Sequence, residues 1–320
     1  MKGNKLDKAS IIAIKDCMGA KKGEKILVIT DEQKNEIGYS LYKNALKLGF
    51  ETLYIEMKSG KTNGEEPPIY IAEMMKYFDI VLCPTSKSLT HTKARREASA
   101  AGARIATFPG ITKEVMIRGL NADYSKISEL TLKLKSIMEN VKKVRVVTEK
   151  GTDIEMKIEG RGIYASKGLF LVKGESGNLP TGETFCAPVE GSANGIFVVD
   201  GSMAGIGKIN DEPIKIIVKN GYAVKISGGK AAGKLKKILS QFGADGKNIA
   251  EFGIGTNYAA KLSGVLLEDE KVLGTIHIAL GNNKSMGGNI DVPIHLDGVV
   301  KYPDVFFDEE IIMEKGHLLI

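Results

Sequence analysis

The feature that most constrains the fold is a regular alternation of strand-like and helix-like segments early in the chain. Short aliphatic runs predict strands at 25–29, 52–56, 79–83 and 104–108. Apolar side chains at helical spacing lie between these runs, and we expect Asp31 to cap the first helix. Repeated strand–helix units place successive strands parallel, so the pattern predicts a parallel sheet with helices on both faces.

The pattern changes after a helix that we expect at 125–140. Lys150-Gly151 and Asn220-Gly221 each separate two strand-like runs, which is typical of β-hairpins. One further helix is expected near 230–242, and the other segments are short strands separated by glycine. The later part of the chain is therefore predicted to be α+β.

Length and pattern together predict two domains for the 320 residues. We expect a Rossmann- or flavodoxin-like α/β domain at 1–141. We expect an α+β domain with a largely antiparallel sheet, which carries a catalytic metal site, at 142–320. Three distant cysteines, Cys17, Cys83 and Cys186, argue against a disulfide framework and favour free, buried thiols.

Charge and hydropathy exclude several classes of partner. The net charge of +6 is spread along the chain, and its basic clusters are not interleaved with aromatic residues, so no nucleic-acid partner is expected. No apolar run is long enough to span a bilayer, and the N-terminus lacks the apolar centre of a signal peptide. We therefore expect a cytoplasmic protein without a membrane partner.

Histidine is scarce, and two of the four histidines have a setting that suggests chemistry. His277 lies in a strand-like run, Thr275–Leu280. His295 and Asp297 are two residues apart on another expected strand, which places both side chains on one face. That arrangement suits two ligands of one metal ion, and it equally suits a hydrogen-bonded structural pair.

Three carboxylates have comparable settings. Glu251 is a charged residue inside an otherwise apolar strand, which is costly unless the charge is paired or bound to a metal. Glu183 lies between two prolines, and Glu270 lies seven residues before His277. Each could alone be a surface or capping acid. Together with the imidazoles they offer the oxygen and nitrogen ligands that suit Zn²⁺, Co²⁺ or Mn²⁺.

Four segments resemble motifs of the aminopeptidase T and aminopeptidase S family of metallopeptidases, in the order of that family. They are Asn178-Leu-Pro-Thr-Gly-Glu-Thr-Phe-Cys-Ala-Pro188, Ala250-Glu-Phe-Gly253, Asp269-Glu270 with His277-Ile-Ala-Leu-Gly281, and Ile294-His-Leu-Asp297. The resemblance implies a leucyl-aminopeptidase-like homodimer that releases N-terminal residues from peptides. It also implies a centre of two divalent metal ions, activated by cobalt or zinc, at Glu183, Glu251, Glu270, His277, His295 and Asp297.

In this hypothesis a metal-bound water attacks the peptide carbonyl, and Glu251 or Glu270 shuttles the proton to the leaving amine. One departure from the family is the lack of tyrosine in 281–289, where that family has its proposed catalytic tyrosine. Lys284 or Ser285 would then have to stabilise the oxyanion.

Other functions remain open from the sequence. His277, His295 and Asp297 would also provide the two histidines and one carboxylate of a non-haem iron dioxygenase, and ring-cleaving dioxygenases of dihydroxypyridine share parts of the pattern. A binding protein that keeps a metal site without turnover is a further alternative. A nucleotide site in the first domain has little support, because no G-x-G-x-x-G or P-loop motif follows the strand at 25–29.

Overall fold

The computed structural model describes residues 4–320, and its contacts divide the chain into two compact units. The N-terminal unit contains the described residues up to 128 and the segment 166–181. The C-terminal unit contains 129–165 and 182–320. Compact units are defined by contacts and not by independent folding, so the expected domain boundary after residue 141 stays a prediction.

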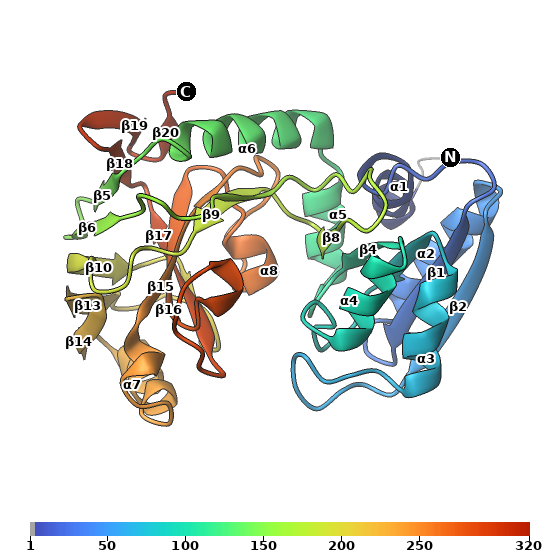
Figure 1. The fold of residues 1–320 in the computed structure, drawn as a ribbon, viewed down its shortest axis with the longest axis horizontal. Helices are drawn as coiled ribbons and strands as arrows, with labels where there is room; N and C mark the ends of the chain where they lie inside the picture. The colour runs from blue at the N-terminus through green and yellow to red at the C-terminus, as the bar shows by residue number, and fades with distance from the viewer. Residues whose placement is uncertain (1–3) are drawn as a thin grey trace. The chain divides into compact units, whose positions relative to one another are not determined.

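A parallel sheet forms the centre of the N-terminal unit, as the alternation of segments predicts (Figure 1). We call it sheet A. Its strands, in spatial order, are β2 (Glu51–Met57), β1 (Lys25–Asp31), β3 (Ile80–Cys83), β4 (Arg104–Thr107) and β8 (Ser176–Asn178). All neighbouring pairs are parallel. The apolar strands β3 and β4 are buried along their whole length, as expected for a sheet covered on both faces.

The helices around this sheet are α1 (Lys5–Ile12), α2 (Asn35–Lys47), α3 (Ile69–Met74), α4 (Lys93–Ala100) and α5 (Lys113–Leu120). Helices α2, α3 and α4 lie between strands, as the pattern predicts, and α1 and α5 were not predicted. Asp31 does not cap α2, which begins at Asn35 without a side-chain cap. Oδ1 of Asp31 accepts from the amide of Gln33 at 3.2 Å, in the turn before the helix. Its Oδ2 accepts at 2.6 Å from the amide and hydroxyl of Ser86, in the loop after β3.

The C-terminal unit has antiparallel strand pairs, so the predicted fold class is confirmed. Sheet B contains, in spatial order, β14 (Tyr222–Ser227), β13 (Ile214–Lys219), β10 (Asn194–Val199), β6 (Asp153–Lys157), β5 (Lys143–Val147), β18 (Asp304–Phe307), β19 (Glu310–Glu314) and β20 (His317–Leu318). Both predicted hairpins are present, as β5–β6 and β13–β14. Asn220 and Gly221 have φ of 49° and 80°, the left-handed pair that a tight two-residue turn requires.

Sheet C carries most of the residues that the sequence singles out. Its strands, in spatial order, are β12 (Gly207–Lys208), β11 (Ser202–Met203), β17 (His295–Lys301), β16 (Thr275–Gly281), β15 (Ile249–Gly255), β9 (Glu183–Cys186) and β7 (Tyr164–Ser166). The longer helices that follow or precede these strands are α6 (Tyr124–Met138) and α7 (Lys230–Leu239), and α8 (Leu266–Asp269) is a single turn.

Sheets B and C share one hydrophobic core, which decides the direction of every side chain in the central strands. Phe197 of sheet B and Phe252 and Ile276 of sheet C belong to the same buried cluster. Because side chains alternate along a strand, the residues next to Phe252 and Ile276 in the sequence point to the opposite face of sheet C. Glu251 and His277 are such residues, and both are buried.

Three further expectations concern the cysteines, membrane spans and location. The three cysteines are free and buried, as predicted. Within residues 4–320, the helices are too short or too polar to cross a membrane. The cytoplasmic location expected from the sequence stays a prediction.

Candidate metal centre

The candidate site lies across β15, β16 and β17 on the face of sheet C that points away from the core. Glu251 pairs with Ala279, and Ala279 pairs with Asp297, so the three residues form a row across the strands. The small side chain of Ala279 leaves room for the two carboxylates on either side of it. A register shift between Ile249 and Glu251 marks a β-bulge, a feature that often re-aims side chains beside active sites.

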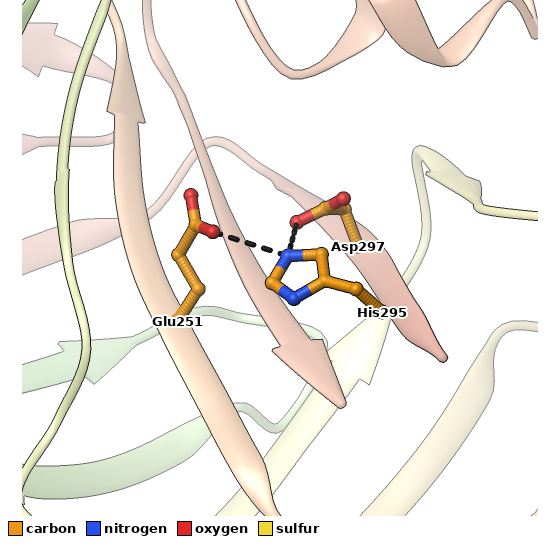
Figure 2. A group of neighbouring side chains, drawn as sticks. All are labelled: Glu251, His295 and Asp297. Atoms are coloured by element: carbon orange, nitrogen blue, oxygen red, sulfur yellow. Dashed lines mark ion pairs between the residues drawn. The ribbon is translucent and has the colours of Figure 1, made fainter. Parts of the chain in front are cut away.

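Three side chains converge at this row, as Figure 2 shows. Nε2 of His295 lies 3.1 Å from Oε2 of Glu251 and 3.4 Å from Oδ1 of Asp297. One ligand atom from each of the three residues lies within 4.8 Å of the others, a spacing at which a single ion could be shared. The imidazole therefore sits between two carboxylates.

The backbone decides which nitrogen of His295 faces the cluster. Nδ1 of His295 lies 2.8 Å from the carbonyl oxygen of Asn282. A carbonyl only accepts, so Nδ1 carries the proton and donates. In the charged ring Nε2 also donates, toward Glu251 and Asp297. In the neutral ring Nε2 would instead direct its lone pair between them, which is the arrangement of a metal-binding histidine.

His277 lies on the other side of Glu251 and is fully buried. Its Nε2 is 3.1 Å from Oε1 of Glu251 and 3.6 Å from Oε2 of Glu183. Gly253 is paired with His277 across the β15–β16 ladder and provides the space for its ring. The structure thus places Glu183, Glu251 and His277 together, with Glu251 shared between the two histidines.

Lys271, which no sequence motif indicates, forms ion pairs with both Glu183 and Glu270. Nζ of Lys271 lies 2.6 Å from Oε1 of Glu183 and 2.5 Å from Oε1 of Glu270. The lysine side chain is only 3% exposed. A buried ammonium is stable only when carboxylates compensate its charge, so these acids hold the lysine in place.

The charges of the cluster shift the pKa of its members. Burial raises the pKa of Glu251, but hydrogen bonds with His277 and His295 outweigh burial, and the pKa lies below its ordinary value. Burial lowers the pKa of His277, yet the hydrogen bond with Glu251 and the charge of Glu183 raise it to about 9. Burial raises the pKa of Asp297, and the charge of His295 outweighs it and keeps the pKa low.

The pKa values of Glu270 and Lys271 also follow from burial and charge. Burial raises the pKa of Glu270 above its ordinary value, although the charge of Lys271 opposes that rise. Burial lowers the pKa of Lys271, but Glu183 and Glu270 outweigh it and the pKa is raised. The lysine therefore stays charged.

The donor set suits a divalent cation. Among the described residues, the buried atoms that have no hydrogen-bond partner include Oε2 of Glu183, Nδ1 of His277 and Oδ1 of Asp297. Leaving such atoms unsatisfied costs free energy, and a cation beside Glu251, His295 and Asp297 would satisfy the carboxylate oxygen at the centre of the cluster. One imidazole and two carboxylates are hard or borderline ligands typical of first-row divalent metals.

With this geometry established, comparison with known proteins identifies the family. A sequence model of the family described as "NicX: 2,5-dihydroxypyridine 5,6-dioxygenase" matches residues 13–320. The chain belongs to this family. A curated 2,5-dihydroxypyridine 5,6-dioxygenase of Pseudomonas putida KT2440 is 23% identical over 245 residues, which cover 72% of this chain and 69% of that protein.

Solved structures agree with this family at the level of the fold. The 2,5-dihydroxypyridine dioxygenase of Pseudomonas putida KT2440 has a TM-score of 0.84 at 17% identity, covering 98% of this chain and 96% of the other. AmpT from Thermus thermophilus has a TM-score of 0.70 at 16% identity, and the match covers 99% of each chain.

The NicX match corrects the expectation of an aminopeptidase. The family is one of dioxygenases, so the predicted metallopeptidase family, hydrolase activity and peptide substrates are wrong. The reason is visible in the fold, because AmpT and this chain share an architecture over their whole lengths. Motifs such as His295-Leu-Asp297 lie on strands of that common scaffold and do not identify the reaction.

Sequence reasoning found the side chains of the cluster but missed their supports. Lys271 follows Glu270 directly, and an acid beside a lysine is usually a solvated surface pair, so no sequence pattern predicts that Lys271 is buried. The role of the Asn282 carbonyl has no sequence signal, because every residue carries one. Gly253 could have been suspected, since a glycine inside an apolar strand often marks a close approach.

Proposed function

We propose that this protein is a metal-dependent dioxygenase that opens the ring of 2,5-dihydroxypyridine, or of a close hydroxypyridine, between carbons 5 and 6. The observation that carries the proposal is the family match over residues 13–320. The cluster of Glu251, His295 and Asp297 supports it, because it offers a site for one redox-active divalent ion. The substrate is accordingly a small aromatic molecule.

The ion is held, in this proposal, by Nε2 of His295 and by carboxylate oxygens of Glu251 and Asp297. Fe²⁺ is the metal we propose, since dioxygen chemistry needs a metal that changes its oxidation state and imidazole with carboxylate suits iron. His277 bonds the oxygen of Glu251 that does not face His295, and so orients this carboxylate. Asn282 orients His295 in the same way.

The reaction balances without an external reductant. The bond between carbons 5 and 6 breaks and both atoms of dioxygen enter the product. The hydroxyl-bearing carbon becomes a carboxyl group, and its neighbour becomes a formyl group on the ring nitrogen. The ring supplies the electrons that dioxygen accepts. The metal would supply a Lewis acid that acidifies the ring hydroxyl and a redox partner for dioxygen.

We propose further that the site takes a single ion. A second ion at the expected ligands Glu183 and Glu270 would have to lie where the ammonium of Lys271 bridges them. The lysine provides a permanent positive charge there, so these two acids are compensated without a metal. Glu270, expected as a proton shuttle, is then a partner that holds Lys271.

Oxygen uptake by the iron-loaded protein tests the proposed function. The chain is loaded with Fe²⁺ without oxygen, mixed with 2,5-dihydroxypyridine and monitored with an oxygen electrode and by loss of the ring absorbance. We expect equal amounts of oxygen and substrate to be consumed, and label from ¹⁸O₂ to appear twice in the product. Protein that holds iron but consumes no oxygen with any dihydroxypyridine would overturn the proposal.

A further inference from the structure

A pocket of about 360 Å³ lies in the N-terminal unit, outside the metal centre. Its walls come from residues that follow three strands of sheet A: Asp31 at the end of β1, the segment 57–68 after β2, and Thr85 to Leu89 after β3. The volume is within the range of sites that bind small molecules. None of these residues belongs to the proposed metal centre.

The strand order places this pocket where open parallel sheets usually bind ligands. β1 is flanked by β2 on one side and by β3 on the other, so the chain leaves the ends of β1 and β3 toward opposite sides. A crevice forms at the carboxyl ends of the strands at such a reversal, and binding sites occur there in many unrelated α/β proteins. The loop after β2 closes the pocket on one side.

Hydrogen bonds fasten that loop, so the pocket is preformed. The amide of Gly64 donates to the carbonyl of Ser88 at 2.8 Å, and the amide of Ser88 donates to Oδ1 of Asn63 at 2.9 Å. Near the other end, the hydroxyls of Ser59 and Ser86 lie 3.1 Å apart. A site held in this way loses little conformational entropy when a ligand binds.

The pocket carboxylates are occupied by donors of the protein itself. Asp31 accepts from Ser86, as described above, and Oε2 of Glu65 accepts from the amides of Lys61 and Thr62. The carboxylate of Glu66 accepts from the first two amides of α4. These acids therefore accept hydrogen bonds from the protein's own loops, and fewer of their lone pairs are available to accept from a ligand.

The pocket lysines are less tightly held. Lys58, Lys61 and Lys87 line the pocket, and among the described residues none of their ammonium groups lies within ion-pair distance of a carboxylate. Glu32 attracts Lys58 and Glu65 attracts Lys61 only over a longer distance. Met57 and Leu89 add an apolar wall. Three ammonium groups without a direct ion pair, beside an apolar surface, favour an anion that also has a hydrocarbon part.

We propose that this pocket binds a small organic carboxylate. The lysines bind the carboxylate group, and the wall formed by Met57 and Leu89 packs against the hydrocarbon part. An inorganic anion would use only the lysines and would bind more weakly, because it leaves the apolar wall uncovered.

Calorimetric titration of the full chain with maleate, benzoate and inorganic phosphate tests this assignment. The pocket variant is Lys58→Gln with Lys87→Gln. The control variant is Lys8→Gln with Lys47→Gln, which removes the same charge from exposed lysines of the same unit. An additional Asp297→Ala background removes binding of carboxylates at the metal centre. Melting temperatures verify that all variants fold.

We expect saturable binding of one carboxylate per chain by the wild type and the control, and at least about tenfold weaker binding by the pocket variant. Three results would overturn the proposal: no saturable carboxylate binding, equal binding by the pocket variant, or tighter binding of phosphate than of either carboxylate. The proposed ring cleavage can fail without affecting this outcome, since binding is measured without turnover.

Discussion

Gly253 faces His277 across the β15–β16 ladder so closely that a Cβ at position 253 would lie 2.1 Å from Nε2 of the imidazole. The backbone of β15 and β16 cannot separate there without breaking the central pair of sheet C. The ring would have to move instead, and with it the hydrogen bond that orients Glu251. The absence of a side chain at position 253 thus keeps the imidazole of His277 in place beside the proposed metal centre.

We therefore expect Gly253→Ala to weaken metal binding about 10–100-fold, the usual cost of losing an orienting partner of a ligand. Titration with Mn²⁺, followed by electron paramagnetic resonance, measures the affinity. Gly233→Ala in α7 is the matched control, since a Cβ there has nothing within 4 Å. That control should bind metal normally and be slightly more stable, because alanine favours a helix. Normal affinity in Gly253→Ala would contradict the role of His277.

Asp297→Ala should remove both the bound ion and ring cleavage. The substitution deletes one of three proposed ligands, whose Oδ1 is buried without a hydrogen-bond partner. Elemental analysis after gel filtration, together with oxygen uptake, measures the loss, which we expect to exceed about a hundredfold in activity. Glu309→Gln, an exposed acid of the same unit, is the control. Retention of stoichiometric iron in Asp297→Ala would show that the ligands are others.

The Lys271 proposal predicts a metal stoichiometry. Wild-type protein should bind a single Mn²⁺ per chain, and Lys271→Ala should bind a second, because Glu183 and Glu270 then lack their cation. Coupling between two Mn²⁺ ions gives a distinct paramagnetic spectrum. Lys284→Ala removes a lysine that pairs with exposed Asp291 and should leave the stoichiometry unchanged.

Removal of Lys271 could unfold the protein, since breaking a buried pair costs about 3–5 kcal/mol. In that case the number of Mn²⁺ ions bound by the wild type tests the proposal of a single ion. Two ions in the wild type would show that Lys271 does not take the place of a metal.

The hydrogen bonds of Glu190 predict how the free energy of unfolding changes as the pH falls. Its carboxylate accepts from Asn283 at 2.9 Å and from the amide of Asn289 at 2.8 Å, and it pairs with Arg161. Burial raises its pKa, but these donors outweigh burial and keep the pKa below the ordinary value of 4.5. The folded state thus binds a proton less readily than the unfolded state, and the stabilisation is present above pH 4.5 and lost as pH falls through the lower folded pKa.

Urea denaturation between about pH 6 and pH 3 measures this effect. Glu190→Gln should be less stable than the wild type at neutral pH by about 1 kcal/mol, and the difference should shrink in acid. A constant difference across this range would contradict the assignment.

The sequence predicted the sheets better than the connections. Strands such as Ile80–Cys83 and the Asn220-Gly221 hairpin carry strong local signals, because burial and turn geometry act on neighbouring residues. The first helix, Lys5–Ile12, was not predicted. It runs into a π-helical turn at Ala13–Cys17, which breaks the 3.6-residue period that reveals a helix.

The site was predicted as a set of residues and not as an arrangement. Glu251, His295 and Asp297 meet because Ala279 lies between β15 and β17, a pairing between segments far apart in the chain. Sequence patterns report the periodicity of one segment, and they contain no register between segments. Two ions were expected from the family resemblance. The proposal of a single ion depends on the ammonium of Lys271, whose place between Glu183 and Glu270 no sequence pattern indicates.

The position of β8 has a consequence for how the chain is made. Residues 176–178 pair with β4 in sheet A, although segment 129–165 of the C-terminal unit precedes them. A ribosome therefore releases β4 with its outer row of amide and carbonyl groups unpaired, and that row stays open until residue 178 has been made. A fragment cut after residue 128 would keep this open edge permanently, and self-association through β4 is the expected fate of such a fragment.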